Sequence, residues 1–473
     1  MEDTKHESRR ETDRPRRLLR ILGVGFGVAV IIGNTIAAGI LRTPGDVAHQ
    51  LPNAWLYIAV WVVGGLYALL GALSIAELGT MIPRSGGQFV FARHALGEYA
   101  GFIVGWSDWL STCGTTAAVS VVIGEYSGAL FPRVSGQAGT VTVAIAVTVV
   151  FALLQWLGVR TGSNVQNVTS LLKALLFVAL VAACFVLGGK TDVAPAAARA
   201  VPGGAALTVA IVLSLQSVIY TYDGWTGVIY FSEEVRDPAR SIPRAMFGGV
   251  LSVIAIYLLV NLALVYVLPI SRIDGQKLAA GVAATEIFPS YGDAVFRSIM
   301  ILALLSGINA YHLMASRVLF AMGRDGLFLK GATKVNEGGT PTVALLLSAA
   351  VAVLFIVGGG LEATGGELAE GQAEQTGGIF KTITAMLAFF FVVNYLMSFI
   401  SVFVLRRREP GRERPYRAWG YPWTTGLVLL GSAAFLFGAY KSDPVPTRYA
   451  LVALAASYPV FRLVKRGLKR SDR

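Results

Sequence analysis

The chain has 473 residues, of which 55% are hydrophobic and 14% are charged, whereas soluble globular domains carry about 25% charged residues. This composition excludes an ordinary soluble domain. The formal net charge of +12 does not indicate a nucleic-acid-binding protein, because the basic residues lie in short connections and tails between apolar segments. The two cysteines and four histidines lack metal-ligand spacing, so no metal centre or cofactor is expected.

Apolar segments recur along the whole chain. A helix of about 20 residues crosses a hydrocarbon layer about 30 Å thick, so these segments predict an all-α integral membrane protein with about twelve transmembrane helices. The first segment is long enough to span and is expected to remain as a helix rather than be removed as a signal. The predicted spans are 21–48, 54–82, 100–130, 138–158, 164–189, 205–232, 243–270, 293–322, 341–360, 380–405, 421–440 and 446–464.

The distribution of basic residues predicts the orientation of these spans. Lys and Arg are concentrated in the tails and in the even-numbered connections, such as 406–417, whereas the odd-numbered connection 361–379 is acidic and has no basic residue. By the positive-inside rule both termini are cytoplasmic. Residues 1–20 and 465–473 are then cytoplasmic tails of a multi-pass protein in a bacterial-type inner membrane.

Two of the predicted spans contain residues that weaken a helix. The first has Gly33, Asn34 and Gly39 near its middle, and the sixth has Asp223 and Gly224 at similar depth. Paired interruptions at corresponding positions of two halves are typical of transporters whose binding site lies at the membrane midplane. A single glycine more often serves close helix packing, which is the interpretation we give to Gly23-x-x-x-Gly27.

Interrupted helices supply the backbone groups that a zwitterion needs. The N-terminus of an outer half-helix offers free N–H groups and a positive dipole end to a carboxylate, and the freed carbonyl groups suit an ammonium group. An amino acid backbone carries both charges, so the sequence predicts a carrier for a small zwitterion.

Several ordered motifs resemble the amino acid, polyamine and organocation permeases, in particular the L-type amino acid transporter branch and its bacterial relatives. The resemblance covers residues from about 20 to about 425. The motifs are Gly33-Asn34-Thr35-Ile36-Ala37-Ala38-Gly39-Ile40, Pro83-Arg84-Ser85-Gly86-Gly87-Gln88-Phe89, Tyr222-Asp223-Gly224-Trp225 with Glu233-Glu234 and Ile242-Pro243, Ser316-Arg317 through Gly326 with Thr340-Pro341, and Arg414-Pro415-Tyr416 with Gly420-Tyr421-Pro422.

This resemblance implies a LeuT-type 5+5 inverted repeat with discontinuous helices 1 and 6. The first repeat is expected over 21–189, the second over 205–405, and helices 11 and 12 over 421–464. The implied substrate site lies between helices 1, 3, 6 and 8. The residues carried over to it are Thr35, Ala37, Ala38, Gly39, Ile40, Tyr220, Asp223, Gly224 and Asn309.

The chain departs from the family pattern in both interrupted helices. The usual Gly-Ser-Gly of helix 1 is Ala37-Ala38-Gly39, which leaves carboxylate binding more dependent on backbone N–H groups. The second glycine of the helix 6 break is replaced by Asp223. That carboxylate is a candidate partner for the substrate ammonium group or a cationic side chain, and the alternative is a cap for freed amides.

Lys173 lies in the middle of the fifth span, where Na⁺-independent relatives carry a lysine. The resemblance implies that its ammonium group replaces a sodium ion and ties helix 5 to carbonyl groups of helices 1 and 8. A buried lysine also makes Lys173 a candidate for coupling transport to protons. The alternative is a lysine that extends to the cytoplasmic surface.

The remaining polar residues in the spans receive structural interpretations. His312 follows Asn309 by three residues in the eighth span, and a packing histidine is favoured over a proton relay. Asp108, Glu125 and Arg317 are expected near helix ends with structural roles. The loop 131–137 contains no cysteine, so the disulfide-linked heavy subunit of animal relatives is not expected.

The sequence thus predicts a secondary active transporter of amino acids that works by alternating access. It is expected to be Na⁺-independent, by exchange or proton coupling, with neutral L-amino acids as substrates. Cationic amino acids or polyamines are the alternative substrates. A channel and a membrane enzyme are less favoured, because no filter loop, nucleotide motif or catalytic constellation is found.

Overall fold

The computed structural model describes residues 18–37, 39–188, 199–276, 278–364, 373–442 and 444–471. Within these residues the chain is helical and forms no β-strand, apart from two isolated bridges that join Leu22 to Val235 and Val335 to Pro341. Ala38 and residues 1–17, which include most of the predicted N-terminal tail, lie outside the described residues.

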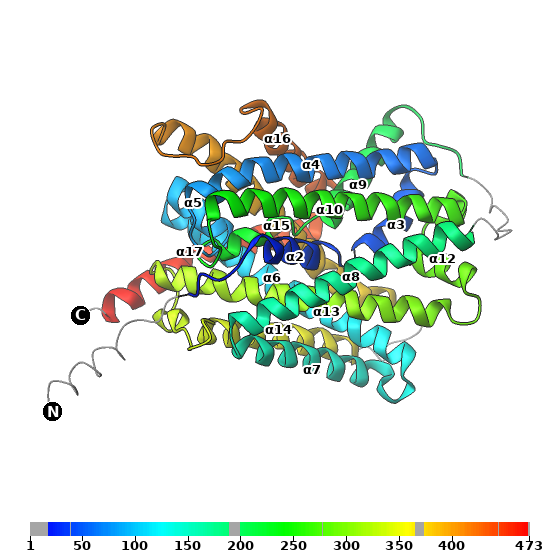
Figure 1. Cartoon of the computed structure of the whole chain (residues 1–473), viewed down its shortest axis with the longest axis horizontal. Coiled ribbons are helices and arrows are strands. Elements are labelled where there is room, and N and C mark those ends of the chain that lie inside the picture. Colours follow the sequence, from blue (N-terminus) through cyan, green and yellow to red (C-terminus); the bar gives the residue numbers. More distant parts are fainter. Residues whose placement is uncertain are drawn as a thin grey trace.

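The long helices run side by side in an elongated bundle (Figure 1). They are α2 (Val24–Thr35), α3 (Gly39–Gln50), α4 (Ala54–Met81), α6 (Glu98–Leu130), α7 (Gly136–Trp156), α8 (Val159–Leu187), α9 (Gly204–Thr221), α10 (Pro238–Val267), α13 (Gly292–Arg324), α14 (Thr342–Thr364), α15 (Ala373–Arg408), α16 (Trp423–Ser442) and α17 (Pro444–Ser471). The short helices are α5 (Gln88–Leu96), α11 (Ile270–Ile273), α12 (Ala279–Ile287), η1 (Pro132–Val134), η3 (Gly227–Phe231) and η4 (Lys330–Thr333). Of these, η3 lies within the predicted sixth span, and the others lie in or next to predicted connections.

The length and apolar composition of the helices fit a multi-pass membrane protein. Among the described residues, nine helices are long and apolar enough to cross a membrane, and the bent pair α2 and α3 raises the number to ten. The predicted third and twelfth spans, α6 and α17, are not among them, since α6 is rich in Gly, Ser and Thr and α17 ends in basic residues. The all-α membrane architecture is confirmed, and the count of twelve spans stays a prediction.

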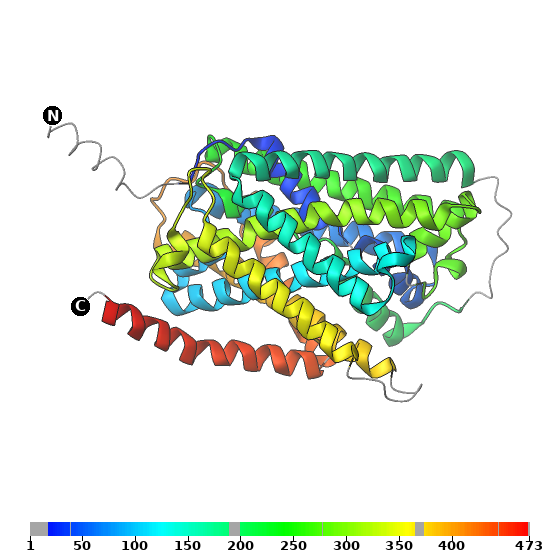
Figure 2. The ribbon, with the colours of Figure 1, turned by 90° about the horizontal axis from the view of Figure 1, so that it is seen from below.

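The connections lie at two opposite ends of the bundle. The short helix α5 and the end of α17 lie at one end, and α12 lies at the other (Figure 1). α17 packs on the outside of the bundle, where it contacts α15 and α6 (Figure 2). Among the candidate spans of the described residues, α13 is the most buried inside the bundle.

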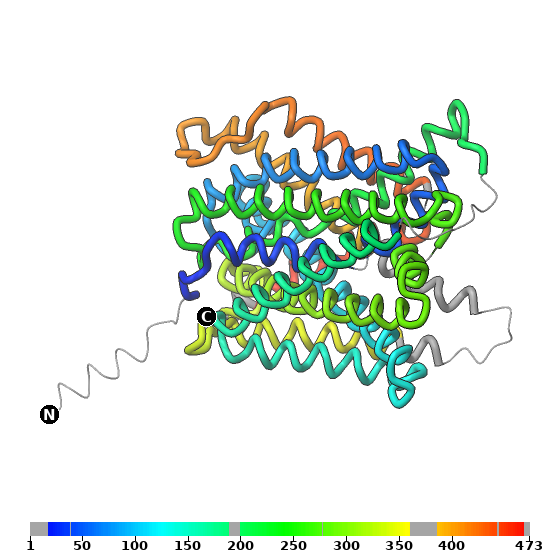
Figure 3. Tube along the Cα trace, turned by 45° about the vertical axis from the view of Figure 1, so that its right-hand side comes forward, coloured from blue at the N-terminus to red at the C-terminus, as the bar shows by residue number. Residues whose placement is uncertain are grey.

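α2 passes between α10 and α8 and contacts both (Figure 3). The close contact with α10 needs Gly27, because a Cβ atom added there would lie 2.5 Å from Cβ of Ala245. A Cβ atom added at Gly23 would have no neighbour within 4 Å. The packing role predicted from sequence is therefore confirmed for Gly27 and wrong for Gly23, which precedes the first turn of the helix.

Candidate functional site

The two interrupted spans break at the same place in the bundle. α2 ends at Thr35 and α3 begins at Gly39, with the two axes bent by 48°. The side-chain amide of Asn34 donates to the carbonyl oxygen of Gly224 at 3.1 Å. Gly224 has φ +111°, and a Cβ atom there would lie 2.9 Å from the Asn34 side chain. Both the backbone conformation and the close approach therefore require glycine.

The start of α3 faces the end of α9. A Cβ atom added at Gly39 would lie 3.1 Å from the methyl group of Thr221, and the hydroxyl groups of Thr43 and Thr221 are 2.7 Å apart. The first N–H groups of a helix have no partner within it, and its N-terminus carries a partial positive charge. The first turn of α3 thus presents an anion-binding end at the break.

Side chains from three other helices donate hydrogen bonds to the backbone carbonyl groups around the first break. Lys173 on α8 donates to the carbonyl oxygens of Gly33 and Ile36, at 2.9 and 2.6 Å. Tyr311 on α13 donates to Asn34 at 3.3 Å, and Tyr257 on α10 donates to Thr35 at 2.7 Å. Four successive carbonyl groups thus receive donors that the interrupted helix does not supply, as the absence of water at this depth demands.

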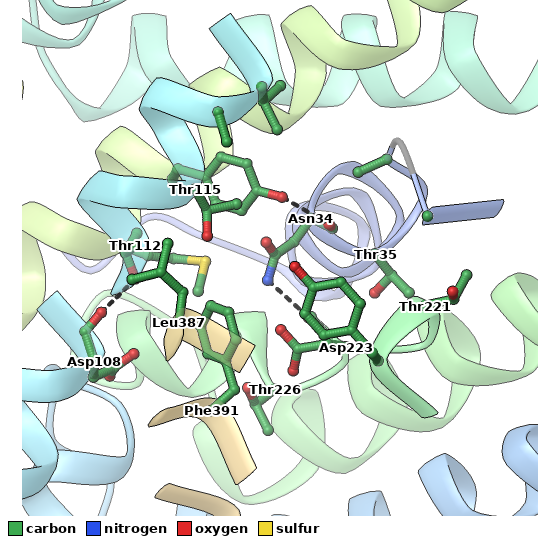
Figure 4. A pocket seen from close by; sticks show the side chains of 18 of the residues that line it. Asn34, Thr35, Asp108, Thr112, Thr115, Thr221, Asp223, Thr226, Leu387 and Phe391 are labelled. Carbon is green, nitrogen blue, oxygen red and sulfur yellow. Dashed lines mark hydrogen bonds between the residues drawn. The ribbon is translucent and has the colours of Figure 1, made fainter. Parts of the chain in front are cut away.

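A cavity of about 320 Å³ lies beside the two breaks. Figure 4 shows side chains of α6, of the two breaks and of α15 around it. Six of the residues proposed from sequence line the cavity, and they are Thr35, Ala37, Gly39, Tyr220, Asp223 and Gly224.

Two of the proposed residues, Asn309 and Ile40, do not line this cavity. Asn309 does not line the cavity, because its amide group is held between α7 and α8: it accepts from Gln155 at 2.5 Å and donates to Gln166 at 2.8 Å. The side chain of Ile40 is fully buried in the core, so the part of Ile40 that the proposed site uses is its backbone N–H group in the first turn of α3. Ala38, the remaining proposed residue, lies outside the described residues.

Lys173 and His312 are both buried behind the cavity wall. The Lys173 side chain is 0% exposed and ends on carbonyl groups of the first span, so it does not extend to the surface. A ring nitrogen of His312 lies 3.1 Å from the carbonyl oxygen of Thr148 on α7. This contact agrees with a packing histidine.

α6 contributes a wall that the sequence reasoning did not predict. Asp108, Thr112, Thr115 and Val119 line the cavity and follow one another by three or four residues, so they share one helix face. Asp108 is not near a helix end, as its sequence position suggested, but is 1% exposed and accepts from the hydroxyl group of Tyr230. The signal in the sequence that could have identified this wall is the helical spacing of Asp108, Thr112 and Thr115 within an otherwise apolar span.

α15 closes the side of the cavity that faces Asp223. The hydroxyl group of Tyr395 donates to the Asp223 carboxylate, and its ring stacks on Trp225 with 4.9 Å between the ring centroids. Leu387 and Phe391 from the same helix also line the cavity. The carboxylate of Asp223 is therefore held in place beside the end of α9.

The cavity is open at one end and closed at the other. Arg42 and Asp46 on α3 are exposed at the open end, whereas Asp108 and Gln88 at the other end are buried. Beyond the closed end Arg317 on α13 forms a buried ion pair with Glu234, with two N–O distances of 3.0 and 2.9 Å. In the part of the chain that the structure describes, no group of three or more His, Cys, Asp or Glu side chains could hold a metal ion.

The bundle, its two adjacent helix breaks and the cavity between them define a multi-pass membrane protein of the kind that binds small solutes inside the bilayer. The family model described as amino acid permease matches residues 26–455, and the chain belongs to this family.

Known transporters resemble the chain over most of its length. It is 28% identical over 459 residues to the serine/threonine exchanger SteT of Bacillus subtilis (strain 168). This match covers 95% of this chain and 98% of SteT. It is 27% identical over 473 residues to the b(0,+)-type amino acid transporter 1 of Homo sapiens, over 93% of this chain and 94% of the relative. It is also 27% identical to the Asc-type amino acid transporter 1 of Mus musculus, over 94% and 81% of the two chains.

Proposed function

We propose that this protein is a Na⁺-independent secondary transporter that carries amino acids by alternating access. The observation that carries this proposal is the cavity at the two helix breaks, where the N-terminus of α3 and the carboxylate of Asp223 face the same space. The similarity to proteins named as amino acid transporters and exchangers supports it.

The two ends of an amino acid fit two different groups of this site. The N–H groups of the first turn of α3, beginning at Gly39, receive the α-carboxylate, as a helix N-terminus does for other anions. The carboxylate of Asp223 receives the α-ammonium group. The carbonyl groups of residues 33–36 are already occupied by Lys173, Tyr257 and Tyr311, which favours Asp223 as the acceptor.

The fold that we propose is the LeuT-type 5+5 inverted repeat. Residues 21–189 and 205–405 form the repeats, residues 421–464 form helices 11 and 12, and both termini, with the tails 1–20 and 465–473, are cytoplasmic. The positions of the two breaks, one in each half, support this arrangement. With this orientation the open end of the cavity, at Arg42 and Asp46, faces outward.

Lys173 replaces a coupling cation in this proposal. Its ammonium group contacts two carbonyl groups of the first break from α8, so a positive charge is built into the protein. Exchange of substrates or coupling to protons then drives transport, and no disulfide-linked heavy subunit takes part. The burial of both cysteines, Cys113 and Cys184, supports the last point.

Neutral L-amino acids are the substrates that the sequence favours, and cationic amino acids are the second candidate. A specific observation favours cationic amino acids: the carboxylates of Asp108 and Asp223 line the same cavity, so a substrate with two positive groups could pair with both. Polyamines fit less well, because they lack the carboxylate that the N-terminus of α3 would bind.

Uptake by the purified protein in liposomes tests the proposed function. We expect saturable uptake of labelled amino acids that unlabelled amino acid inside the vesicles accelerates, with no dependence on sodium. Measurement with and without an imposed pH gradient separates exchange from proton coupling. A non-saturating ion current, or chemical conversion of the amino acid, would support a channel or an enzyme instead and contradict the proposal.

A further inference from the structure

The closed end of the cavity has more hydrogen-bond acceptors than donors. Both carboxylate oxygens of Asp108 lie 2.9 Å from the hydroxyl group of Tyr230. A hydroxyl group carries one hydrogen atom, so Tyr230 donates to one of these oxygens at a time, whereas an ionised carboxylate accepts several donors. The Asp108 side chain is nevertheless buried. Its carboxylate retains acceptor capacity toward the cavity.

Gln88 adds a second acceptor at the same end. It begins α5, is 3% exposed and lines the cavity, and its oxygen Oε1 has no hydrogen-bond partner among the described residues. The preceding residue, Gly87, packs on Tyr230, since a Cβ atom there would lie 2.5 Å from the tyrosine ring. Gln88 therefore follows a residue that packs on Tyr230, and Gln88, Asp108 and Tyr230 all line the cavity. A buried acceptor without a donor is unfavourable.

The basic residue of the cavity wall is too distant to neutralise Asp108. Among the cavity-lining residues that the structure describes, Arg42 is the one Lys or Arg, and it pairs with Glu125 at 4.0 Å. Glu125 follows Asp108 on α6 by 17 residues, which is about 25 Å at 1.5 Å per residue. Arg42 and Glu125 are about half exposed, at 49% and 53%, so this pair belongs to the open end.

We propose that Asp108 and Gln88 form a subsite for a second cationic group of the substrate, an ammonium or guanidinium group at the end of its side chain. This inference rests on the proposed function, in which Gly39 and Asp223 hold the α-carboxylate and the α-ammonium group. A buried carboxylate is stable when a charged donor pairs with it. A basic side chain that reaches the closed end supplies the charge for Asp108 and a further N–H group for Gln88.

The ratio of lysine to serine transport measures this subsite. We compare the ratio of Vmax/KM for labelled lysine and labelled serine in liposomes that contain the full-length protein or a variant. Asp108→Asn keeps the shape and the contact with Tyr230 but removes the charge, and we expect it to lower the ratio by about ten-fold or more. Gln88→Met removes an uncharged acceptor, and we expect a smaller fall in the same direction.

Glu125→Gln is the matched control, since it removes a carboxylate from the same helix at the open end. We expect it to leave the lysine-to-serine ratio unchanged. Size-exclusion profiles and thermal stability in detergent establish that each variant is folded. If Asp108→Asn does not fold, Gln88→Met carries the test, and an unchanged ratio in that variant overturns the subsite.

Two further results would overturn the inference without touching the proposed function. One is wild-type protein that transports serine but is neither inhibited by lysine or arginine nor able to carry them. The other is folded Asp108→Asn that loses serine and lysine transport in equal proportion, which would indicate a structural role. Wild-type protein without saturable uptake of any amino acid contradicts the proposed function itself.

Discussion

The hydroxyl group of Tyr257 donates to the carbonyl oxygen of Thr35 at 2.7 Å, at the point where α2 ends. The same hydroxyl group lies 3.0 Å from the carbonyl oxygen of Thr221, where α9 ends. Since a tyrosine hydroxyl group has one hydrogen atom, the two half-helices share one donor. Tyr257 is therefore a positioning residue for both breaks.

Tyr257→Phe removes this shared donor while keeping the aromatic ring. We expect a loss of stability of about 1 kcal/mol and a lower Vmax for amino acid uptake, because the ends of α2 and α9 lose their common partner. Thermal unfolding in detergent and uptake into liposomes measure the two effects. Tyr222→Phe is the control, since that hydroxyl group donates at 3.2 Å to Trp61 within the unbroken helix α4. Equal uptake by the two variants would remove the special role of Tyr257.

Lys173→Ala removes two hydrogen bonds to the first break, at Gly33 and Ile36. We expect loss of net uptake and of its dependence on a pH gradient, because the built-in positive charge is gone. Lys173→Met, which keeps most of the side-chain volume, separates the loss of charge from the loss of packing. If both variants transport as the wild type does, Lys173 has no coupling role.

The ion pair between Arg317 and Glu234 is almost fully buried, with exposures of 1% and 0%. Removal of one partner leaves an unpaired charge, so we expect Glu234→Gln to lower stability by about 3–5 kcal/mol. Replacement of both partners by apolar residues, as in Arg317→Met with Glu234→Leu, should restore most of that stability. Melting temperatures of the single and double variants in detergent test this, and a double variant less stable than Glu234→Gln would contradict it.

Gly27→Ala tests the packing of α2 on α10. The added methyl group would lie 2.5 Å from Ala245 and 2.9 Å from Val228, and we expect a loss of about 1–3 kcal/mol from overpacking. Gly23→Ala, whose added methyl group has no neighbour within 4 Å, is the matched control and should be close to wild type. Equal melting temperatures for the two variants would show that the contact at Gly27 relaxes freely.

Local sequence was sufficient to locate the two breaks, because the residues that end a helix are themselves visible in it. Gly39 and Gly224 lie where the predicted spans are interrupted, and six proposed residues around them line the cavity. Long apolar segments likewise predicted the helical membrane architecture.

The opposite walls of the cavity were harder to predict, because they depend on how helices rotate against one another. The family resemblance placed Asn309 on the site, whereas hydrogen bonds to Gln155 and Gln166 hold its amide group away from this cavity. Asp108 was placed near a helix end, but it lies well inside α6, where it accepts a hydrogen bond from the hydroxyl group of Tyr230. Tertiary contacts, rather than local patterns, decide both cases.

The break in the first span is assembled by neighbouring helices as much as by its own glycines. Donors for the carbonyl groups of residues 33–36 come from α8, α10 and α13, and the amide of Asn34 donates to the carbonyl oxygen of Gly224, which follows the end of α9. Transplanting the segment 33–40 into another helical membrane protein would therefore not reproduce an open site. Lys173, Tyr257 and Tyr311 would have to be moved with it, and their positions define the minimum set for grafting such a break into a designed bundle.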